Sequence, residues 1–265
     1  MGHEMRTVPV RRVVVHAPDL KSFYLPREFH VAPGQFVLLW LPGVDEKPFS
    51  VSGVVDEFLE VTIKAVGPFS RAMMDLAAGQ RIGLRGPFGR GFDPAGPAIL
   101  VGGGCGVAPV RHLAREMART GLEFELLLGA RTATDLMFRD EYRRAGAWLV
   151  TEDGSLGTRG LVTDRLRELL AQGRHRHLFA AGPEGMLLAV REIADRHLVD
   201  YQLSFERYMK CGIGICGHCS MDGTGIRMCC EGPVLSRQDL AGITDLGLPH
   251  RDAAGARAPR PLRSS

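Results

Sequence analysis

Five of the six cysteines in this 265-residue chain lie between residues 211 and 230. Cys211, Cys216 and Cys219 have the spacing C-x4-C-x2-C, and the adjacent Cys229 and Cys230 follow. In plant-type ferredoxins this spacing, completed by a fourth cysteine further along, holds a 2Fe–2S cluster. Zinc sites usually show two C-x2-4-C pairs, and only one is present here. The pattern therefore predicts a 2Fe–2S cluster, with a structural zinc ion or a set of disulfides as the less favoured alternatives.

Glycines fill the positions between these cysteines. Gly212, Gly214 and Gly217 allow the backbone to wrap closely around a cluster and to aim N–H groups at its sulfur atoms. The fourth ligand is either Cys229 or Cys230, because neighbouring side chains on an extended segment point to opposite sides. The residues alone leave this choice open.

A second candidate site comes earlier in the chain. Residues 46–51 read Glu-Lys-Pro-Phe-Ser-Val, and residues 67–71 read Gly-Pro-Phe-Ser-Arg at the start of a short helix. We expect Ser70 to cap this helix, whose first N–H groups suit an anion. Flavin-binding barrels of the ferredoxin-reductase type carry a similar Arg-x-Tyr/Phe-Ser strand, with the arginine on the flavin diphosphate. Lys47 stands there instead and keeps the charge without the two-pronged donor geometry. The order of these two motifs along the chain predicts bound FAD, with FMN or no flavin as alternatives.

A third candidate site is a glycine-rich loop between the apolar run 97–101 and a helix. Glycines at such a turn let backbone N–H groups approach a pyrophosphate. The loop departs from G-x-G-x-x-G and is similar to the G-G-G-x-G-x-A/T-P loop of ferredoxin-reductase-like domains, which bind a nicotinamide nucleotide. A later turn, Ala-Gly-Pro-Glu-Gly-Met, is similar to their second loop. The candidate residues are Gly102, Gly103, Gly104, Gly106, Pro109, Gly182 and Pro183.

Three single residues near these motifs need an interpretation. Cys105, inside the glycine loop, is interpreted as a small turn residue rather than a catalytic thiol. Arg131 is either a phosphate partner or a surface charge, so it does not distinguish NADP from NAD. His218, between two of the cysteines, is interpreted as a hydrogen-bonding loop residue, because a Rieske site needs two histidines.

The elements that would position these motifs change in kind near Gly96. Before it, short β-like runs alternate with Pro/Gly turns, and only residues 70–76 look helical, which predicts an antiparallel barrel. After it, apolar strands alternate with helices, which predicts a doubly wound parallel sheet. We expect four parts: a six-stranded-type FAD-binding β-barrel over 1–95, an NAD-binding α/β domain over 96–202, a 2Fe–2S module over 203–240 and a C-terminal tail over 241–265. The Ala/Arg/Pro/Ser-rich residues 251–265 are expected to be mobile.

Composition narrows the class of protein. The net charge of +3 is modest and argues against nucleic acid as the main partner. The N-terminal residues lack an apolar signal segment, and no apolar run reaches about 18 residues, so we expect no membrane span. A cytoplasmic protein is the resulting expectation, and clustered cysteines there more often bind metal than form disulfides.

Several further segments are distinctive. They are residues 33–37, 42–50, 102–109, 153–164, 206–219 and 250–255, and the most specific read Glu-Arg-Tyr-Met-Lys-Cys-Gly-Ile-Gly-Ile-Cys-Gly-x-Cys and His-Arg-Asp-Ala-Ala-Gly. With the order of barrel, nucleotide domain and cysteine module, the chain resembles the electron-transfer subunits of NAD-linked dihydroorotate dehydrogenases, in the ferredoxin-reductase superfamily. The resemblance covers about residues 8 to 253.

The resemblance implies particular cofactor contacts. The flavin contacts are Lys47, Pro48, Phe49, Ser50, Thr62, Ile63, Lys64, Phe69 and Ser70. The family has Gly-Thr at the last two positions, so only the hydroxyl role passes to Ser70. The family also closes its cluster with Cys-x-Asp-Gly-Pro. Cys229 fits that frame, with Glu231 in place of aspartate, and the implied ligands are Cys211, Cys216, Cys219 and Cys229.

The resemblance also implies a function as an oxidoreductase subunit. Dihydroorotate would be oxidised to orotate on a separate FMN-containing catalytic subunit, in an assembly of two copies of each chain. Electrons would then pass through the cluster, at the subunit interface, and FAD to NAD⁺. A rival interpretation keeps this chain of cofactors but serves a cytoplasmic hydrogenase or sulfite reductase. A non-enzymatic alternative is a redox sensor or scaffold with a structural metal.

Overall fold

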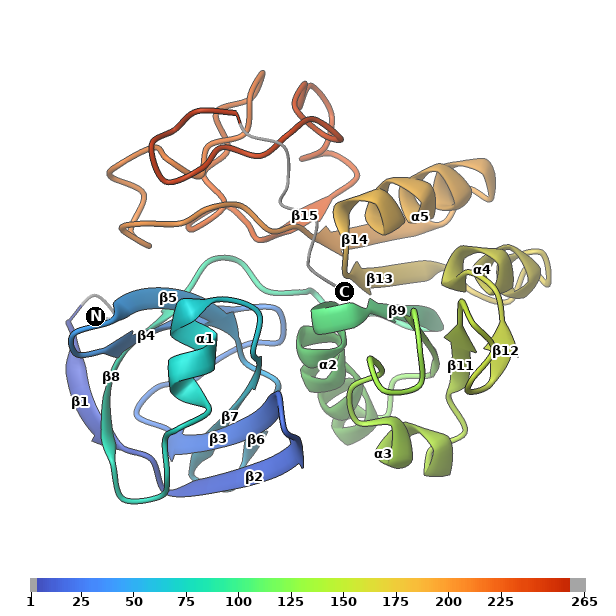
Figure 1. The fold of residues 1–265 in the computed structure, drawn as a ribbon. Helices are drawn as coiled ribbons and strands as arrows, with labels where there is room; N and C mark the ends of the chain where they lie inside the picture. Colours follow the sequence, from blue (N-terminus) through green and yellow to red (C-terminus); the bar gives the residue numbers. More distant parts are fainter. Residues whose placement is uncertain (1–3, 258–265) are drawn as a thin grey trace. The chain divides into compact units, whose positions relative to one another are not determined.

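The computed structural model describes residues 4–257, which fall into two compact units (Figure 1). Among the described residues, the first unit comprises residues 4–91, 206–233 and 243–257. The second comprises Phe92–Phe205 and Val234–Gly242. The chain therefore leaves the first unit after the barrel and returns to it with the cysteine-rich segment.

The first unit contains two four-stranded antiparallel sheets, in the orders β1-β8-β4-β5 and β2-β3-β7-β6. The strands are β1 (Arg6–Pro9), β2 (Arg12–Ala17), β3 (Leu20–Pro26), β4 (Phe36–Leu41), β5 (Asp45–Ser50), β6 (Gly53–Val55), β7 (Phe58–Lys64) and β8 (Arg81–Phe88). Only two residues separate β1 from β2, and two separate β5 from β6. Six chain segments thus supply the eight strands, two of them by bending from one sheet to the other. The expected six-stranded type of barrel is confirmed.

Side-chain alternation along the strands builds the barrel core. Phe23 on β3 pairs with Val61 on β7, and both are fully buried in the core cluster. The next pair along, Ser22 and Thr62, faces the opposite side of the same sheet. A single helix, α1 (Pro68–Met73), contributes Phe69 and Met73 to the core cluster.

The second unit is a seven-stranded sheet in the order β12-β11-β10-β9-β13-β14-β15. Its strands are β9 (Ala98–Gly103), β10 (Phe124–Ala130), β11 (Trp148–Thr151), β12 (Thr158–Arg159), β13 (His177–Ala181), β14 (Asp200–Ser204) and β15 (Val234–Ser236). Its helices are η1 (Gly104–Gly106), α2 (Val107–Thr120), α3 (Arg139–Arg144), α4 (Val162–Leu170) and α5 (Glu184–Arg196). All strand pairs are parallel except β14 with β15, so the predicted doubly wound sheet is confirmed.

Strand β15 changes how the C-terminal third is divided. We expected one module over residues 203–240. The structure groups residues 206–233 with the barrel, whereas residues 234–242 belong to the second unit because β15 pairs antiparallel with β14. The domain boundaries stay predictions.

The segment expected to be a mobile tail is ordered in part. Arg251 and Arg257 form an antiparallel bridge, and Arg251 donates to the carbonyl of Ser220. Long-range side-chain bonds, which composition does not reveal, hold residues 251–257 in place. Residues 258–265 lie outside the described residues. No helix within residues 4–257 is long and apolar enough to cross a membrane.

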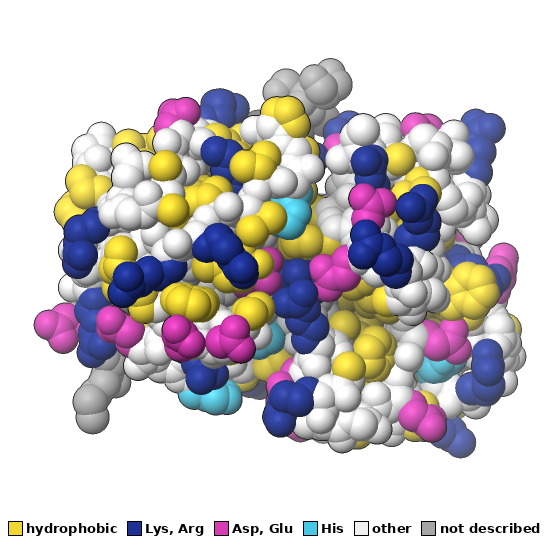
Figure 2. Space-filling model, turned by 90° about the horizontal axis from the view of Figure 1, so that it is seen from below, with side chains coloured by type: hydrophobic (Ala, Val, Ile, Leu, Met, Phe, Trp, Pro, Cys, Tyr) yellow, Lys and Arg dark blue, Asp and Glu magenta, His cyan; other side chains and the backbone are white. Residues whose placement is uncertain are grey.

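Acidic and basic side chains are interspersed over the face of the molecule seen in Figure 2. Many of the surface pairs join residues three or four apart on one helix, such as Arg119 with Glu116 and Arg196 with Glu192. Exposed pairs of this kind contribute at most about 1 kcal/mol each. Burial of the sheet and barrel cores is therefore the main source of stability.

Candidate functional site

The loop that carries the first cysteines is shaped by glycines. Gly212, Gly214 and Gly217 have φ angles of 74°, 76° and 65°, in the left-handed region that other residues rarely adopt. A Cβ atom on Gly214 would lie 2.7 Å from the Cys230 sulfur. The glycines thus allow both the sharp turns and the close approach of the second cysteine segment.

An irregular hairpin brings Cys219 and Cys229 together. Met221 donates its N–H to the carbonyl of Ile226 at 2.8 Å, and Met228 donates to the carbonyl of Cys219 at 3.2 Å. The backbone N–H of Cys229 then donates to the Cys219 sulfur at 3.4 Å. The hairpin therefore closes the gap in sequence between the third and fourth predicted ligands.

The predicted ligands interact with their neighbours. Cys211 interacts with Cys216, and Cys219 interacts with Cys229 and with Cys211. The Cys229 sulfur also lies 3.8 Å from that of Cys230. A 2Fe–2S cluster takes four cysteines, two on each iron, and the residues present fit that group. Within residues 4–257 no three His, Cys, Asp or Glu side chains are grouped so as to hold a single metal ion.

The surroundings of two of these thiols, Cys211 and Cys219, favour the thiolate, which is the form that binds iron. Burial opposes ionisation of Cys211, but N–H groups of Cys216 and Ile213 lower its pKa to about 6. The Cys229 thiol, against the effect of burial, lowers the pKa of Cys219 to about 7. The Cys219 sulfur and burial in turn raise the pKa of Cys229. One proton shared by a close pair of sulfurs accounts for the opposite directions.

The adjacent cysteines differ in their surroundings. Cys229 is buried against Cys219, whereas Cys230 is half-buried and its sulfur lies against Gly214. The two sulfurs are 3.8 Å apart. This geometry favours Cys229 as the fourth ligand, which remains a prediction.

The predicted flavin contacts on β5 lie beside α1 and the cysteine-bearing segment. The rings of Phe49 and Phe69 stack with centroids 5.7 Å apart, which joins β5 to α1. The Lys47 ammonium pairs with Asp45 and lies 5.6 Å from the centroid of the Tyr208 ring. The residues just before the cysteine cluster therefore contact the strand on which the flavin is expected.

The predicted contacts on β7 alternate between its two faces. Ile63 is buried in the barrel core, and Thr62 faces the other side. The Thr62 hydroxyl hydrogen-bonds to those of Ser22 and Ser52, at 2.7 and 2.8 Å. Lys64 lies on the same side as Thr62, with Asp19 at 3.9 Å. Ile63 can thus reach a flavin only through its backbone, whereas Thr62 and Lys64 face outward from the core.

The expected helix cap at Ser70 is wrong in position. Helix α1 begins at Pro68, and its N-cap is Gly67. Ser70 is the third helical residue, and its Oγ accepts the backbone N–H groups of Val66 and Gly67 at 2.8 and 2.9 Å. The hydroxyl acts as the N3 side chain of a capping box. It accepts backbone N–H groups just before the helix and so fixes the backbone where the helix begins.

The two predicted nucleotide loops lie against each other. Gly103 ends β9 and Gly106 lies in the turn after it. Cβ atoms at these positions would lie 2.5 Å from the Met186 sulfur and 2.2 Å from the backbone of Ala181, respectively. Strands β9 and β13 are neighbours, and the strand order reverses between them. Nucleotides bind beyond the carboxyl ends of strands at such a reversal. Gly182 closes the contact, since its own Cβ would meet Met186 at 2.5 Å.

The remaining nucleotide-loop residues start the helix that follows. Gly102 is the second-last residue of β9, Gly104 has φ of 53°, and Pro109 lies in the first turn of α2, where a missing N–H costs nothing. Pro183 is the N-cap position of α5. The sheet therefore brings together every residue predicted to contact the nucleotide.

Sequence reasoning gave no role to Arg227. Its guanidinium donates to the Gly214 carbonyl at 2.9 Å and forms a two-pronged ion pair with Glu231. The bond ties the first cysteine loop to the segment that carries the last cysteines. The sequence signal that could have indicated this ion pair is an arginine and a glutamate four residues apart, on either side of Cys229 and Cys230.

Comparisons with known proteins agree with this arrangement. Residues 206–241 match the family described as the iron–sulfur cluster binding domain of dihydroorotate dehydrogenase B. Residues 100–192 match the oxidoreductase NAD-binding domain. Each match covers one of the sites that the motifs define.

A solved structure extends the likeness to the whole fold. The NADH-dependent reduced ferredoxin-NADP oxidoreductase shares 25% identity with a TM-score of 0.78, over 89% of this chain and 90% of that one. The FAD/NAD-binding domain of a nitric oxide dioxygenase from Vibrio cholerae, at 18% identity and a TM-score of 0.64, shares the fold over 75% of this chain and 98% of its own.

Curated relatives match over nearly the full length. Probable electron transfer subunits of dihydroorotate dehydrogenase B (NAD(+)) are 40% identical in Methanocaldococcus jannaschii and 42% identical in Methanothermobacter thermautotrophicus. The alignments cover 93% and 94% of this chain, and 95% and 96% of the relatives. The chain belongs to the family of electron-transfer subunits of NAD-dependent dihydroorotate dehydrogenase B.

Proposed function

We propose that this chain passes electrons from a catalytic subunit that oxidises dihydroorotate to orotate, through a 2Fe–2S cluster and FAD, to NAD⁺. The observation that carries the proposal is a hairpin that brings Cys229 against Cys219 and is tied by Arg227 to the glycine-rich loop of Cys211 and Cys216. This arrangement lies inside the region that matches the family's iron–sulfur domain. A cluster transfers single electrons, a nicotinamide takes a hydride, and a flavin exchanges electrons with both.

The proposed cluster ligands are Cys211, Cys216, Cys219 and Cys229. They belong to the first unit, as does the strand β5 on which the flavin is expected. The contact between Lys47 and Tyr208 joins the two within that unit. The barrel thus supports both proposed electron-transfer groups on one compact body.

The proposed flavin contacts come from three elements of the barrel. They are Lys47, Pro48, Phe49 and Ser50 on β5, Thr62, Ile63 and Lys64 on β7, and Phe69 and Ser70 on α1. Lys47 supplies a positive charge for the diphosphate, and it keeps that charge close to Asp45 until an anion competes for it. Phe69 and Ile63, buried in the core, contribute backbone groups only.

The proposed nucleotide site is formed by the loops after β9 and β13. Their close packing leaves backbone N–H groups of residues 104–108 at the start of α2, where a pyrophosphate is favoured. We propose NAD rather than NADP because the relatives are named for NAD(+).

The proposed partner is an FMN-containing catalytic subunit, in an assembly of two copies of each chain in the cytoplasm. Electrons must enter near the cluster, and Ile215 in the first cysteine loop is 80% exposed beside the exposed Cys216. An exposed apolar side chain at an electron-entry point suits the centre of a protein contact. We propose that Ile215 contacts the partner.

The function is tested with the chain co-purified with a candidate catalytic subunit. The expected results are a visible spectrum of flavin and 2Fe–2S, and NAD⁺ reduction that depends on dihydroorotate. Cys216→Ser should abolish both the cluster and the dihydroorotate-dependent activity, while NADH still bleaches the flavin. Normal dihydroorotate-to-NAD⁺ activity without the cluster would refute the electron route.

The partner contact is tested separately. Ile215→Glu should weaken association with the catalytic subunit while the cluster spectrum is unchanged. Leu198→Glu, on an 88% exposed leucine of the second unit, is the matched control and should leave association intact. If both variants associate equally well with the catalytic subunit, the interface does not include Ile215. A partner without FMN would favour a hydrogenase- or sulfite-reductase-type assembly.

A further inference from the structure

Residues 249–257, which we name the strap, form a turn that is fixed by its own side chain. The Asp252 carboxylate accepts the backbone N–H groups of Ala254 and Ala256, at 2.8 and 3.1 Å. The backbone N–H of Asp252 donates to the carbonyl of Ala256 at 2.8 Å. An aspartate that closes its own turn in this way makes the strap a preformed structure rather than a trailing end.

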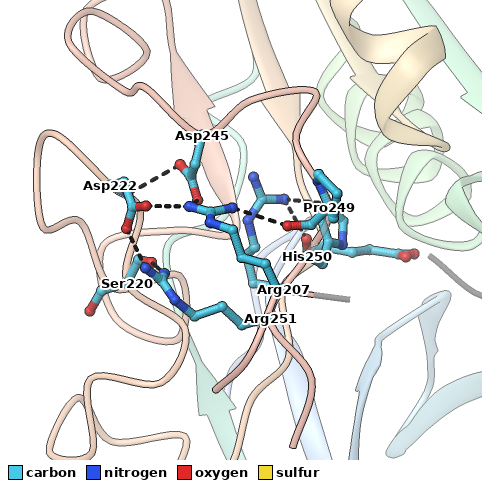
Figure 3. Close-up of polar contacts among 9 residues, drawn as sticks. Arg207, Ser220, Asp222, Asp245, Pro249, His250 and Arg251 are labelled. Atoms are coloured by element: carbon cyan, nitrogen blue, oxygen red, sulfur yellow. Dashed lines mark hydrogen bonds and ion pairs between the residues drawn. The ribbon is translucent and has the colours of Figure 1, made fainter. Parts of the chain in front are cut away.

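The arginines at either side of this turn both pair with the carboxylate of Asp222, and Figure 3 shows Arg251 beside it. Arg251 donates to Asp222 at 2.6 Å and to the Ser220 carbonyl at 3.2 Å, and Arg257 pairs with the other oxygen of Asp222. Both Ser220 and Asp222 lie in the hairpin that carries Cys219 to Cys229. The strap is therefore anchored directly on that hairpin.

The buried carboxylate of Asp245 stabilises the position of Asp222. Asp245 is only 4% exposed, and its Oδ1 accepts the backbone N–H of Asp222 at 3.1 Å. The Arg257 guanidinium lies 3.7 Å from its other oxygen. A buried charge without a cation nearby is costly, so Arg257 stabilises both acids at once. These contacts are mutually dependent and fix the position of Asp222.

The strap also contacts the loop between two predicted ligands. The Nε2 atom of His218 lies 2.6 Å from the Asp252 carbonyl oxygen, so this nitrogen carries the proton and donates. The His218 ring also packs against the Tyr208 ring in an edge-type arrangement, with centroids 5.2 Å apart. His218 is thus held from two sides, one of which is the strap.

We propose that the strap is a positioning element of the cluster site. Through His218 it fixes the turn between Cys216 and Cys219, and through Asp222 it fixes the hairpin from Cys219 to Cys229. Outer contacts that orient ligands commonly change metal affinity by about 10- to 100-fold when removed. The inference rests on the cluster assigned in the proposed function.

The test is the rate at which iron leaves the reduced, purified chain in the presence of a ferrous-iron chelator. The double variant Arg251→Gln/Arg257→Gln is expected to release iron about tenfold faster, with a changed electron paramagnetic resonance line shape of the reduced cluster. Arg6→Gln removes a surface arginine of the same unit, paired with Glu28, and is the matched control. It should release iron at the wild-type rate.

If the double variant does not fold, a second pair of variants tests whether the strap positions the cluster site. His218→Gln keeps an N–H donor for the Asp252 carbonyl, whereas His218→Leu does not. Faster release in the leucine variant with near-normal release in the glutamine variant supports the strap. Wild-type rates and spectra in all strap variants would overturn it. Wild-type protein without a 2Fe–2S spectrum would instead overturn the proposed function.

Discussion

The cysteine-bearing segment and the parallel sheet differ in what fixes their backbones. Strands β9 and β13 pair over five residues each, and every residue from Ala98 to Gly103 is buried. Residues 206–233, all of which the structure describes, form no helix or strand beyond isolated bridges. Turns at glycines and a few long side chains, chiefly those of Arg227 and Arg251, hold that segment.

This contrast indicates where each region obtains its stability. The sheet is stabilised by apolar burial and tolerates the loss of single polar contacts. The cysteine segment buries little beyond Met221, Met228 and two cysteines, so binding of a cluster would supply much of its folding free energy. Substitutions in the cysteine-bearing segment should therefore affect the cluster, whereas substitutions in the parallel sheet should affect packing.

The largest effect is expected at the adjacent cysteines. Cys229→Ser should abolish the cluster spectrum, because Cys229 contacts Cys219 in the buried end of the hairpin. Cys230→Ser should keep the cluster, because Cys230 is only half-buried and Cys229 is the one of the two that bonds to Cys219. Visible absorbance and iron content of both purified variants are the measurements. The reverse outcome would make Cys230 the ligand.

The sheet should respond most strongly at Gly106. A Cβ atom there would lie 2.2 Å from the backbone of Ala181, which cannot move away as a flexible side chain can. Gly106→Ala should lower the free energy of unfolding by about 1–3 kcal/mol and weaken NADH binding. Thermal unfolding and an NADH titration measure the two effects.

Gly185→Ala is the matched control for the substitution at Gly106. Gly185 lies in α5, and a Cβ atom there meets no heavy atom within 4 Å. Alanine at this helical position should be neutral or slightly stabilising. Equal losses in both variants would mean that the loop contact does not shape the nucleotide site.

A smaller effect is expected at Arg227. Arg227→Met removes a donor to the Gly214 carbonyl and a positive charge near Cys229 and Cys230. Loss of a nearby cation disfavours the reduced, more negative cluster. The midpoint potential should fall, by an amount on the order of 60 mV if the loss is equivalent to a tenfold change in the one-electron equilibrium. A redox titration followed by electron paramagnetic resonance measures it, and an unchanged potential would limit Arg227 to a structural role.

Periodicity predicted the regular regions well. Strands β7 and β13 show why: each is a run of apolar or alternating residues ended by turn signals. Strand β15 was not predicted. Its three residues are too few to show a period, and only pairing with β14 makes it a strand.

The candidate sites were predictable where spacing along the chain carries the chemistry. The cysteine spacing and the glycine loops are local signals. The structure packs the two glycine loops against each other and brings Cys229 to Cys219, while the roles of these residues stay predictions. The position of Ser70 and the ordering of residues 251–257 were missed for another reason. The first depends on hydrogen bonds from the backbone N–H groups of Val66 and Gly67. The second depends on arginines that reach Asp222 across about thirty residues of sequence. Amino-acid composition and spacing do not reveal such contacts.

The smallest effect is expected at an ion pair of the second unit. Glu141 pairs with the buried Arg111 and with Arg115. Burial opposes its ionisation, but the two arginines together hold its pKa below the ordinary glutamate value. Glu141→Gln at neutral pH should therefore lower the free energy of unfolding by about 1 kcal/mol, since the half-exposed carboxylate is partly screened by solvent.

The pH dependence of this pair follows from the direction of the shift. Because the pKa is lower in the folded state, the contribution of Glu141 is fully present above its unfolded pKa of about 4.3 and is lost as pH falls through the lower folded value. The difference in unfolding free energy between wild type and Glu141→Gln should therefore be constant from pH 7 to pH 5 and shrink below about pH 4. Denaturant unfolding across that range measures it. A difference that grew on acidification would mean that the carboxylate destabilises the fold, and that burial outweighs the two arginines.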